Sequence, residues 1–509
     1  MGILIDHGGF SAISPKQLAW GLPLAALVLG FGYTVWRCIY NLYFHPLRRF
    51  PGPKFAAMSF IPYSRILTCG DGHFKVLDLH LKYGPIVRVA PNFLLINHPD
   101  AINDIRGHRK PGQPEHGKDQ IRHMPHIHNI IGANREDHSR YRRSLAHGFS
   151  HQAMLEQEPI ITGYVDQLMD RLRRDCGNGT QKIDMVRWFN FTTFDIIGDL
   201  SFGESFDCLQ NSNYHPWVEL IFQSVKNLVY MATIRYFQFS KSINNFLNKF
   251  ALPSDVSGRY AENFRLSAMK VQKRLDSGSN RPDFITSMTA KRNVSALSFE
   301  ELTSNAVILI IAGSETTATA LSAAAYFLGL HPEAQAKLAQ EVRSNFKSPQ
   351  DITITSVQHL PYMLAVLDES MRVFPPVPGG LPRITAKGGG MIAGEFVPEH
   401  AHVDVWQWPM YHNPNYWAQV EEFIPERWLG DPRFKNDKRD VFQPFSAGPR
   451  NCIGKNLAYS EMRLILARVV FEYDIKLAEG TEGWDKRGKS FTLWEKGEVN
   501  VYLTPRKVE

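Results

Sequence analysis

The chain has 509 residues, 44% of them hydrophobic and 21% charged, which is the composition of an ordinary globular protein and excludes a disordered or low-complexity one. Its formal net charge of +7 comes from basic residues scattered among 50 acidic ones, with no motif of a nucleic-acid binder. The five cysteines are widely spaced and form no CxxC, which argues against a disulfide framework or a structural zinc site and fits a reducing compartment.

An uncharged stretch near the amino end, residues 18–36, predicts a membrane anchor, because about 20 apolar residues cross a bilayer as a helix. A cleaved signal peptide is the alternative, but the apolar run is long for one and no small-residue cleavage site follows. Four basic residues within 37–54, against one before the stretch, place the bulk of the chain in the cytosol. The predicted layout is a lumenal segment 1–17, an anchor 18–36, a basic and proline-rich linker 37–54, and one main domain 55–509.

A second long apolar segment, residues 302–330, predicts a helix that crosses the core of the main domain. Ser298 and Glu301 have the spacing of a capping box, and His331 followed by Pro332 ends the pattern. A second membrane span is the alternative. Glu315 disfavours it, because a charged side chain at the middle of a bilayer costs roughly 2.5 to 3.5 kcal/mol.

Glu315 lies in the stretch GSETTAT, among four hydroxyl side chains. Hydroxyls inside a helix bond back to carbonyls one turn earlier, and Gly313 lacks a side chain, so we expect the helix to be distorted there and to open a polar notch. In such a notch Glu315 and Thr316 would relay protons to a reacting group. A satisfied buried carboxylate without a catalytic role is the alternative.

The stretch from 359 to 383 predicts another helix, which ends before Pro375. Glu369 and Arg372 are three residues apart and share a face of it, a common pair that is weak evidence by itself. Arg427, in the downstream segment FIPERW, is a candidate for a second guanidinium on Glu369, which would make a buried network.

Cys452 lies in the stretch FSAGPRNCIG, just before apolar residues at helical spacing. Amides and the dipole at a helix start favour a thiolate, but by only about 0.3 to 1 kcal/mol, so we expect a metal ion to complete a buried site. Gly448 and Gly454 leave room for a flat ligand near the sulfur, and Arg450 suits a carboxylate. Haem has these properties. A structural cysteine and a nucleophile are the alternatives, and no local histidine supplies the base that a nucleophile needs.

These segments together resemble the cytochrome P-450 family of haem-thiolate monooxygenases. The segments 312–316, 369–372 and 425–428 are similar to the family's oxygen-activation helix, ExxR pair and PERF segment, in the family's chain order. Its FxxGxRxCxG signature is matched at Phe445, Gly448, Arg450, Cys452 and Gly454. The resemblance implies a mainly α fold, a single large P-450-like helical domain with small β-sheets, preceded by an N-terminal transmembrane helix.

The resemblance also implies the cofactor and the residues that hold it. Cys452 would be the axial thiolate ligand of haem b, and Glu315 with Thr316 would deliver protons on the opposite side. Arg142, Arg383 and Arg450 would bind the haem carboxylates. His138 stands where the family usually has the tryptophan of WxxxR, which leaves its contact with a carboxylate open. The family's substrate pocket would be lined from residues 106–133, 214–239, 307–316, 377–381 and 490–493.

The partners follow from what the chain lacks. It has neither a dinucleotide-binding fingerprint nor a flavin domain, so electrons from NADPH would come through a separate NADPH-cytochrome P-450 reductase, with cytochrome b5 as a further candidate. The predicted basic docking face comprises Arg140, Arg142, Arg143, Lys455 and the run 433–440, with ordinary solvated charge as the alternative.

The likeness to fungal secondary-metabolism members implies an endoplasmic-reticulum enzyme that oxidises a lipophilic terpenoid or polyketide. Desaturation, oxidative cyclisation or peroxide rearrangement are alternative reactions, and a non-catalytic haem sensor or carrier is a further alternative.

Overall fold

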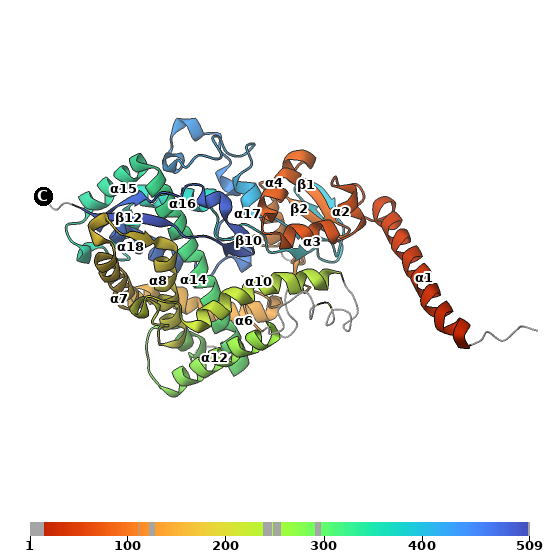
Figure 1. Ribbon diagram of the computed structural model, residues 1–509, viewed down its shortest axis with the longest axis horizontal. Helices are drawn as coiled ribbons and strands as arrows, with labels where there is room; N and C mark the ends of the chain where they lie inside the picture. Colours follow the sequence, from red (N-terminus) through yellow and green to blue (C-terminus); the bar gives the residue numbers. More distant parts are fainter. Residues whose placement is uncertain are drawn as a thin grey trace, which may run out of the picture.

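The computed structural model describes residues 15–110, 112–121, 128–237, 247, 256–290 and 297–506 (Figure 1). Helix α1 (Pro15–Tyr43) projects away from the rest of the protein, and its apolar side chains from Leu24 to Trp36 are exposed (Figure 1). The stretch Pro23–Tyr43 is long and apolar enough to cross a membrane. The helix continues seven residues past the predicted end at 36, because the first proline after Pro23 is Pro46. Most of the predicted lumenal segment 1–17 lies outside the described residues.

The core of the main domain is built around α14 (Phe299–Leu330), which runs through its middle (Figure 1). Its capping box is formed: the Ser298 hydroxyl accepts from the Glu301 amide at 3.2 Å, and the Glu301 carboxylate accepts from the Ser298 amide at 2.8 Å. Two thirds of its most apolar stretch, 67%, is buried inside the protein. The predicted core helix is therefore confirmed, and a second membrane span is not supported.

The other helices of the described chain surround α14 or pack against the helices that do. Those that pack most extensively against α14 are α8 (Met185–Phe202), α12 (Val256–Asp276), α13 (Phe284–Thr289), α15 (Pro332–Asn345), α16 (Pro361–Val373) and α18 (Lys455–Glu472). The remaining α-helices in the described part of the chain are α2 (Lys54–Met58), α3 (Ile61–Thr68), α4 (Gly72–Tyr83), α5 (Ala101–Arg106), α6 (Arg135–Ala146), α7 (His151–Asp175), α9 (Cys208–Asn211), α10 (Pro216–Tyr236), α17 (Gln407–Tyr411) and α19 (Trp484–Arg487).

The strands form small sheets at the edges of this body. The largest sheet has the order β1-β2-β8-β5-β3, with β2 and β8 parallel and the other neighbours antiparallel. Its strands are β1 (Ile86–Ala90), β2 (Phe93–Ile96), β3 (Gly117–Lys118), β5 (Arg383–Ile384) and β8 (His402–Asp404). The others are the sheet β4 (Lys182–Asp184), β12 (Asn500–Pro505) and β9 (Tyr473–Leu477), and the hairpins β6 (Gly390–Ile392) with β7 (Glu395–Val397) and β10 (Lys489–Phe491) with β11 (Leu493–Glu495). The expected mainly α fold with small sheets is confirmed.

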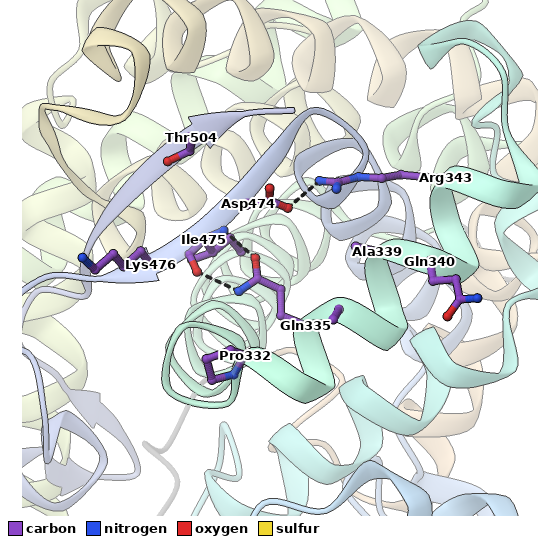
Figure 2. A pocket seen from close by; sticks show the side chains of 10 residues that line it. Pro332, Gln335, Ala339, Gln340, Arg343, Asp474, Ile475, Lys476 and Thr504 are labelled. Carbon is purple, nitrogen blue, oxygen red and sulfur yellow. Dashed lines mark hydrogen bonds and ion pairs between the residues drawn. The ribbon is translucent and has the colours of Figure 1, made fainter. Parts of the chain in front are cut away.

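A surface groove lies where α15 meets β9, an edge strand of its sheet (Figure 2). The Gln335 amide donates to the Ile475 carbonyl at 2.7 Å and accepts from the Ile475 amide at 2.5 Å. Arg343 pairs with Asp474 at 2.8 Å beside it (Figure 2). These side chains satisfy an exposed strand edge, so the groove has a structural explanation.

Candidate active site

Cys452 lies at the end of a tight loop, three residues before α18 begins at Lys455. Its amide donates to the Phe445 carbonyl at 2.9 Å, which closes the loop, and its sulfur faces a cavity inside the protein. Burial raises the pKa of the Cys452 thiol, while the Gly454 amide and the nearby Arg142 and Lys455 lower it, with burial outweighing them. A cation bound beside the sulfur would therefore favour the thiolate form of Cys452.

The cavity beside the sulfur has a volume of about 310 Å³ and a mainly apolar lining. One side is lined from α14, which contributes Leu309, Ala312 and Thr316. The predicted pocket segments 106–133, 307–316 and 377–381 all contribute residues. The described parts of 214–239 and the segment 490–493 do not line it, which corrects that part of the expectation.

The glycines around Cys452 serve different purposes. Gly448 has φ +75°, and a Cβ there would lie 1.9 Å from the Arg106 carbonyl oxygen, so this glycine lets the loop cross the end of α5 and does not line the cavity. A Cβ at Gly454 would approach nothing closer than Phe149 at 3.7 Å and the Cys452 sulfur at 3.9 Å. The protein chain itself would tolerate a side chain at position 454. Because glycine has none, space is left there for a bound group.

Basic side chains gather at the cavity. His138 and Arg142 come from α6, Arg383 from β5, and Arg450 from the cysteine loop. Arg142 donates to the carbonyl and side-chain oxygens of Asn451 at 2.7 and 2.5 Å. Arg450 donates to Glu115 at 2.5 Å and to the Ala133 carbonyl at 2.9 Å.

His138 contributes no positive charge to this set. It is buried, and its pKa is lowered to about 3, first by burial and then by the cations around it, so the ring is neutral at physiological pH. A neutral imidazole keeps one ring N–H, so His138 can still donate a hydrogen bond to a bound group.

The acid and the alcohol of α14 face different ways. Thr316 lines the cavity, and its hydroxyl donates to the Ala312 carbonyl at 2.6 Å. Glu315 does not line the cavity, and its carboxylate is ion-paired with Lys496, which follows β11. The two residues therefore do not share a notch in this conformation.

The predicted distortion of α14 near Gly313 is also absent, since the helix is regular along its whole described length from Phe299 to Leu330. The hydroxyls do bond back to carbonyls one turn earlier, as Ser314 does to Ile310 at 2.6 Å. A Cβ at Gly313 would lie 2.7 Å from the Ile197 side chain of α8. Close packing of two helices, and not a kink, is what requires this glycine.

Comparisons with known proteins identify this arrangement. The family Cytochrome P450 matches residues 52–501. The trichothecene C-15 hydroxylase of Fusarium sporotrichioides is 52% identical over 490 residues, which cover 95% of this chain and 99% of that protein. The cytochrome P450 monooxygenases astJ of Aspergillus oryzae and tpeC of Talaromyces stipitatus are 41% and 43% identical and cover 96% and 94% of their own lengths. The chain belongs to the cytochrome P450 family. It is a monooxygenase, and the family implies haem with thiolate ligation of its iron.

The residues of this P450 fit haem. Among the described residues no group of three or more His, Cys, Asp or Glu side chains could hold a metal ion. A haem-thiolate site needs only one protein ligand, and Cys452 lines the cavity. Gly454 leaves space beside the sulfur, and the Nε and Nη1 atoms of Arg383 are buried without a hydrogen-bond partner. A flat group that carries carboxylates would fill the space beside Gly454 and would accept hydrogen bonds from Arg383.

The Glu369 network of this P450 lies fully inside the protein. Arg372 holds the Glu369 carboxylate through two bonds of 2.8 Å, and Arg427 adds a third at 3.2 Å. Arg372 also donates to the carbonyls of Val420 and Glu422 at 2.8 Å. Burial alone would raise the pKa of Glu369, but the two guanidiniums hold it below its usual value. The network ties the segment 418–428 to α16.

Several buried charged side chains received no role in the sequence analysis, among them Arg106, Lys118 and Glu461, which line the cavity, and Lys496, whose side chain is 4% exposed. Arg106 and Lys118 were included only as members of the pocket segment 106–133, because no motif singled out any of the four. Two members of the predicted docking face also differ from expectation, since Arg140 binds Glu301 and Arg142 binds Asn451. Arg143, Lys435, Lys438 and Lys455 are exposed.

Proposed function

We propose that this P450 inserts one oxygen atom from O₂ into a lipophilic small molecule, with electrons from NADPH delivered by a separate reductase. The observation that carries the proposal is that Cys452 and Thr316 line one mainly apolar cavity. Family membership supports the haem, and the apolar lining supports the class of substrate.

Cys452 is the iron ligand in this proposal, and Phe445, Gly448 and Gly454 shape the loop and the space around it. Bound there, haem supplies the reduction of O₂ and the transfer of one oxygen atom. Arg142, Arg383 and Arg450 bind its carboxylates, and His138 donates a neutral hydrogen bond to them. Glu369, Arg372 and Arg427 form the structural network that holds the neighbouring segment in place.

Thr316 positions a proton donor in the cavity through its hydroxyl, which both donates and accepts. Glu315 is the acid that resupplies protons from outside, and it does so when the side chain leaves Lys496. Water is excluded by the apolar side chains of α14 and of the segment 377–381, which protects the reacting groups.

The substrate is proposed from the relatives. A fungal terpenoid or polyketide intermediate of secondary metabolism is the class we propose, and a trichothecene is the first candidate because of the 52% identity to a trichothecene C-15 hydroxylase. Hydroxylation is the favoured reaction, with desaturation, oxidative cyclisation and peroxide rearrangement as alternatives.

The membrane layout is proposed from α1. This helix anchors the protein once in the endoplasmic-reticulum membrane, with residues 1–17 lumenal and the domain 55–509 cytosolic. The exposed cations Arg143, Lys435, Lys438 and Lys455 offer a docking face for NADPH-cytochrome P450 reductase, and cytochrome b5 is a second candidate partner.

A spectral screen tests the proposal. Full-length protein in lipid is titrated with trichothecenes, other terpenoids and polyketides, and each ligand that shifts the haem spectrum is incubated with NADPH and reductase. An oxygenated product that depends on both supports the proposal. Turnover without NADPH would instead indicate peroxide rearrangement, and haem binding without any oxidation would indicate a sensor or carrier.

A further inference from the structure

A row of aromatic side chains begins at the wall of the cavity. Trp494, on β11, lies at this wall: its indole Nε1 donates to the Pro375 carbonyl at 2.7 Å, and the next residue, Pro376, lines the cavity. The ring of Phe374 stacks on that of Trp494, with ring centroids 4.3 Å apart, and lies 4.6 Å from the ring of Trp484 on α19. The row therefore connects the cavity wall with α19.

The row ends at Tyr326, on α14. The ring of Tyr326 lies 5.3 Å from that of Trp484, and its hydroxyl donates to a carboxylate oxygen of Asp485 at 3.1 Å. Tyr326 is only 1% exposed, whereas Asp485 is partly exposed and is followed by two exposed residues. A buried phenol at the end of the row thus contacts a carboxylate that reaches solvent. Trp494, Phe374, Trp484 and Tyr326 are called the aromatic row below.

The chemistry of these side chains suits the transfer of an electron. Indole and phenol rings can give up one electron to a strong oxidant, and the electron moves quickly between rings that lie a few ångströms apart. A phenol that loses an electron also loses its proton, so it needs a hydrogen-bonded base. Burial, and then the charge of Asp485, raise the pKa of Tyr326 to about 12, so the phenol keeps its proton until it is oxidised.

The packing of a hydrophobic core explains why these rings are buried, since aromatic side chains bury a large apolar area. It does not require that the row start beside the cavity or that its last member be a phenol bonded to a partly exposed acid. These two features are what a path for oxidising equivalents needs at its two ends.

We propose that the aromatic row carries oxidising equivalents from the cavity to Tyr326, which protects the protein when oxygen is reduced and no substrate is oxidised. The inference rests on the proposed monooxygenase function, whose reaction supplies the oxidant. One electron moves from Tyr326 through Trp484 and Trp494 to the oxidant, which is reduced by one electron, and the phenol proton moves to Asp485. A one-electron reductant in solution, such as ascorbate, then returns the electron, and Asp485 returns the proton.

The test detects the radical by electron paramagnetic resonance. Substrate-free holoprotein in lipid is mixed with peracetic acid, which supplies the oxidant without NADPH or reductase, and is rapidly frozen. The wild type should show a tyrosyl signal, and Tyr326→Phe should lose it. Asp485→Asn should lower the yield of the signal, because the phenol proton then has no carboxylate to receive it.

Variants at Trp484 test the path. Trp484→Phe should abolish the tyrosyl signal and speed the bleaching of the haem absorbance by peracetic acid, because a phenylalanine ring is not oxidised. Trp484→Tyr keeps an oxidisable ring and should restore both properties. Trp217→Phe is the matched control, since this indole is also 1% exposed and hydrogen-bonded, to Asn263, and does not line the cavity. It should change neither the signal nor the bleaching.

The outcomes separate the sources of failure. A tyrosyl signal in Tyr326→Phe or in Trp484→Phe that equals the wild-type signal would overturn the inference, because the electron would then follow another route. Should Tyr326→Phe not fold, Asp485→Asn and Trp484→Phe are judged by the same comparison. If the wild type binds no haem, the proposed function fails and the inference with it. If the wild type oxidises a substrate but forms no tyrosyl radical, only the inference fails.

Discussion

The carboxylate of Glu315 is ion-paired with the ammonium group of Lys496, and the two side chains are only 5% and 4% exposed. The pair joins the middle of α14 to the chain just after the hairpin β10–β11, 181 residues further along the sequence. It holds the expected proton donor away from the cavity in which Thr316 lies.

We expect Lys496→Met to destabilise the protein by about 3 kcal/mol, because it leaves a buried carboxylate without its partner. Urea denaturation followed by circular dichroism measures the change. The double variant Glu315→Gln/Lys496→Met should recover most of the loss, and Lys489→Met, an exposed lysine of the same hairpin, should have no effect. A single variant as stable as the wild type would show that the pair is not formed.

Thr316→Ala should uncouple NADPH consumption from product formation, because the cavity loses the hydroxyl that positions a proton donor. The expected result is a lower ratio of product to NADPH consumed and a higher yield of hydrogen peroxide. Ser322→Ala is the matched control, since this hydroxyl bonds to the Ala318 carbonyl at 2.6 Å on the same helix and does not line the cavity. Unchanged coupling in Thr316→Ala would refute the role of Thr316.

Cys452→Ser should abolish the carbon monoxide difference spectrum of a thiolate-ligated haem, because serine is a poor iron ligand at neutral pH. Cys69→Ser, which changes a cysteine that does not line the cavity, should keep the spectrum. If Cys452→Ser retained it, another residue would be the iron ligand.

Glu369→Gln should lower the free energy of unfolding by about 3 to 5 kcal/mol, because it leaves the buried guanidiniums of Arg372 and Arg427 without a counter-charge. The midpoint of urea denaturation measures the change. Glu262→Gln removes the carboxylate of an exposed pair with Arg265 and should leave the midpoint where it is. Equal midpoints for the two variants would argue against the network.

Glu461 gives a prediction for pH. It lies on α18, lines the cavity and is almost fully buried, and burial raises the pKa of its carboxyl to about 8. Between about pH 4.5 and 8 the folded protein keeps a proton that the unfolded chain has lost, so its free energy of unfolding falls as pH rises, by roughly 1.4 kcal/mol per pH unit.

Glu461→Gln removes this contribution, so its stability advantage over the wild type should grow with pH across that window. Urea denaturation at pH 5.5, 6.5 and 7.5 measures it, with the exposed Glu479→Gln as the control. A constant difference between variant and wild type would mean that the Glu461 carboxyl does not change its pKa on folding.

Local sequence pattern was sufficient to predict several structural features of this protein. The capping box at Ser298, the start of α18 after Cys452 and the shared face of Glu369 and Arg372 each depend on residues within about one helical turn of one another. The motif positions around Cys452 likewise lie within ten residues, which is why the sequence pointed to the haem-thiolate class.

Contacts between distant segments were decided only by tertiary packing. The pairing of Lys118 with Arg383, the ion pair of Glu315 with Lys496 and the approach of Ile197 to Gly313 each join positions more than a hundred residues apart. The sequence alone determined the long helix α14, the apolar helix α1 and the cysteine loop, because these follow from hydrogen bonds and apolar spacing along one segment. Tertiary packing decides which basic side chains line the cavity and that Glu315 points away from it. The reason is that only packing sets the distance between charged groups that are far apart in the sequence.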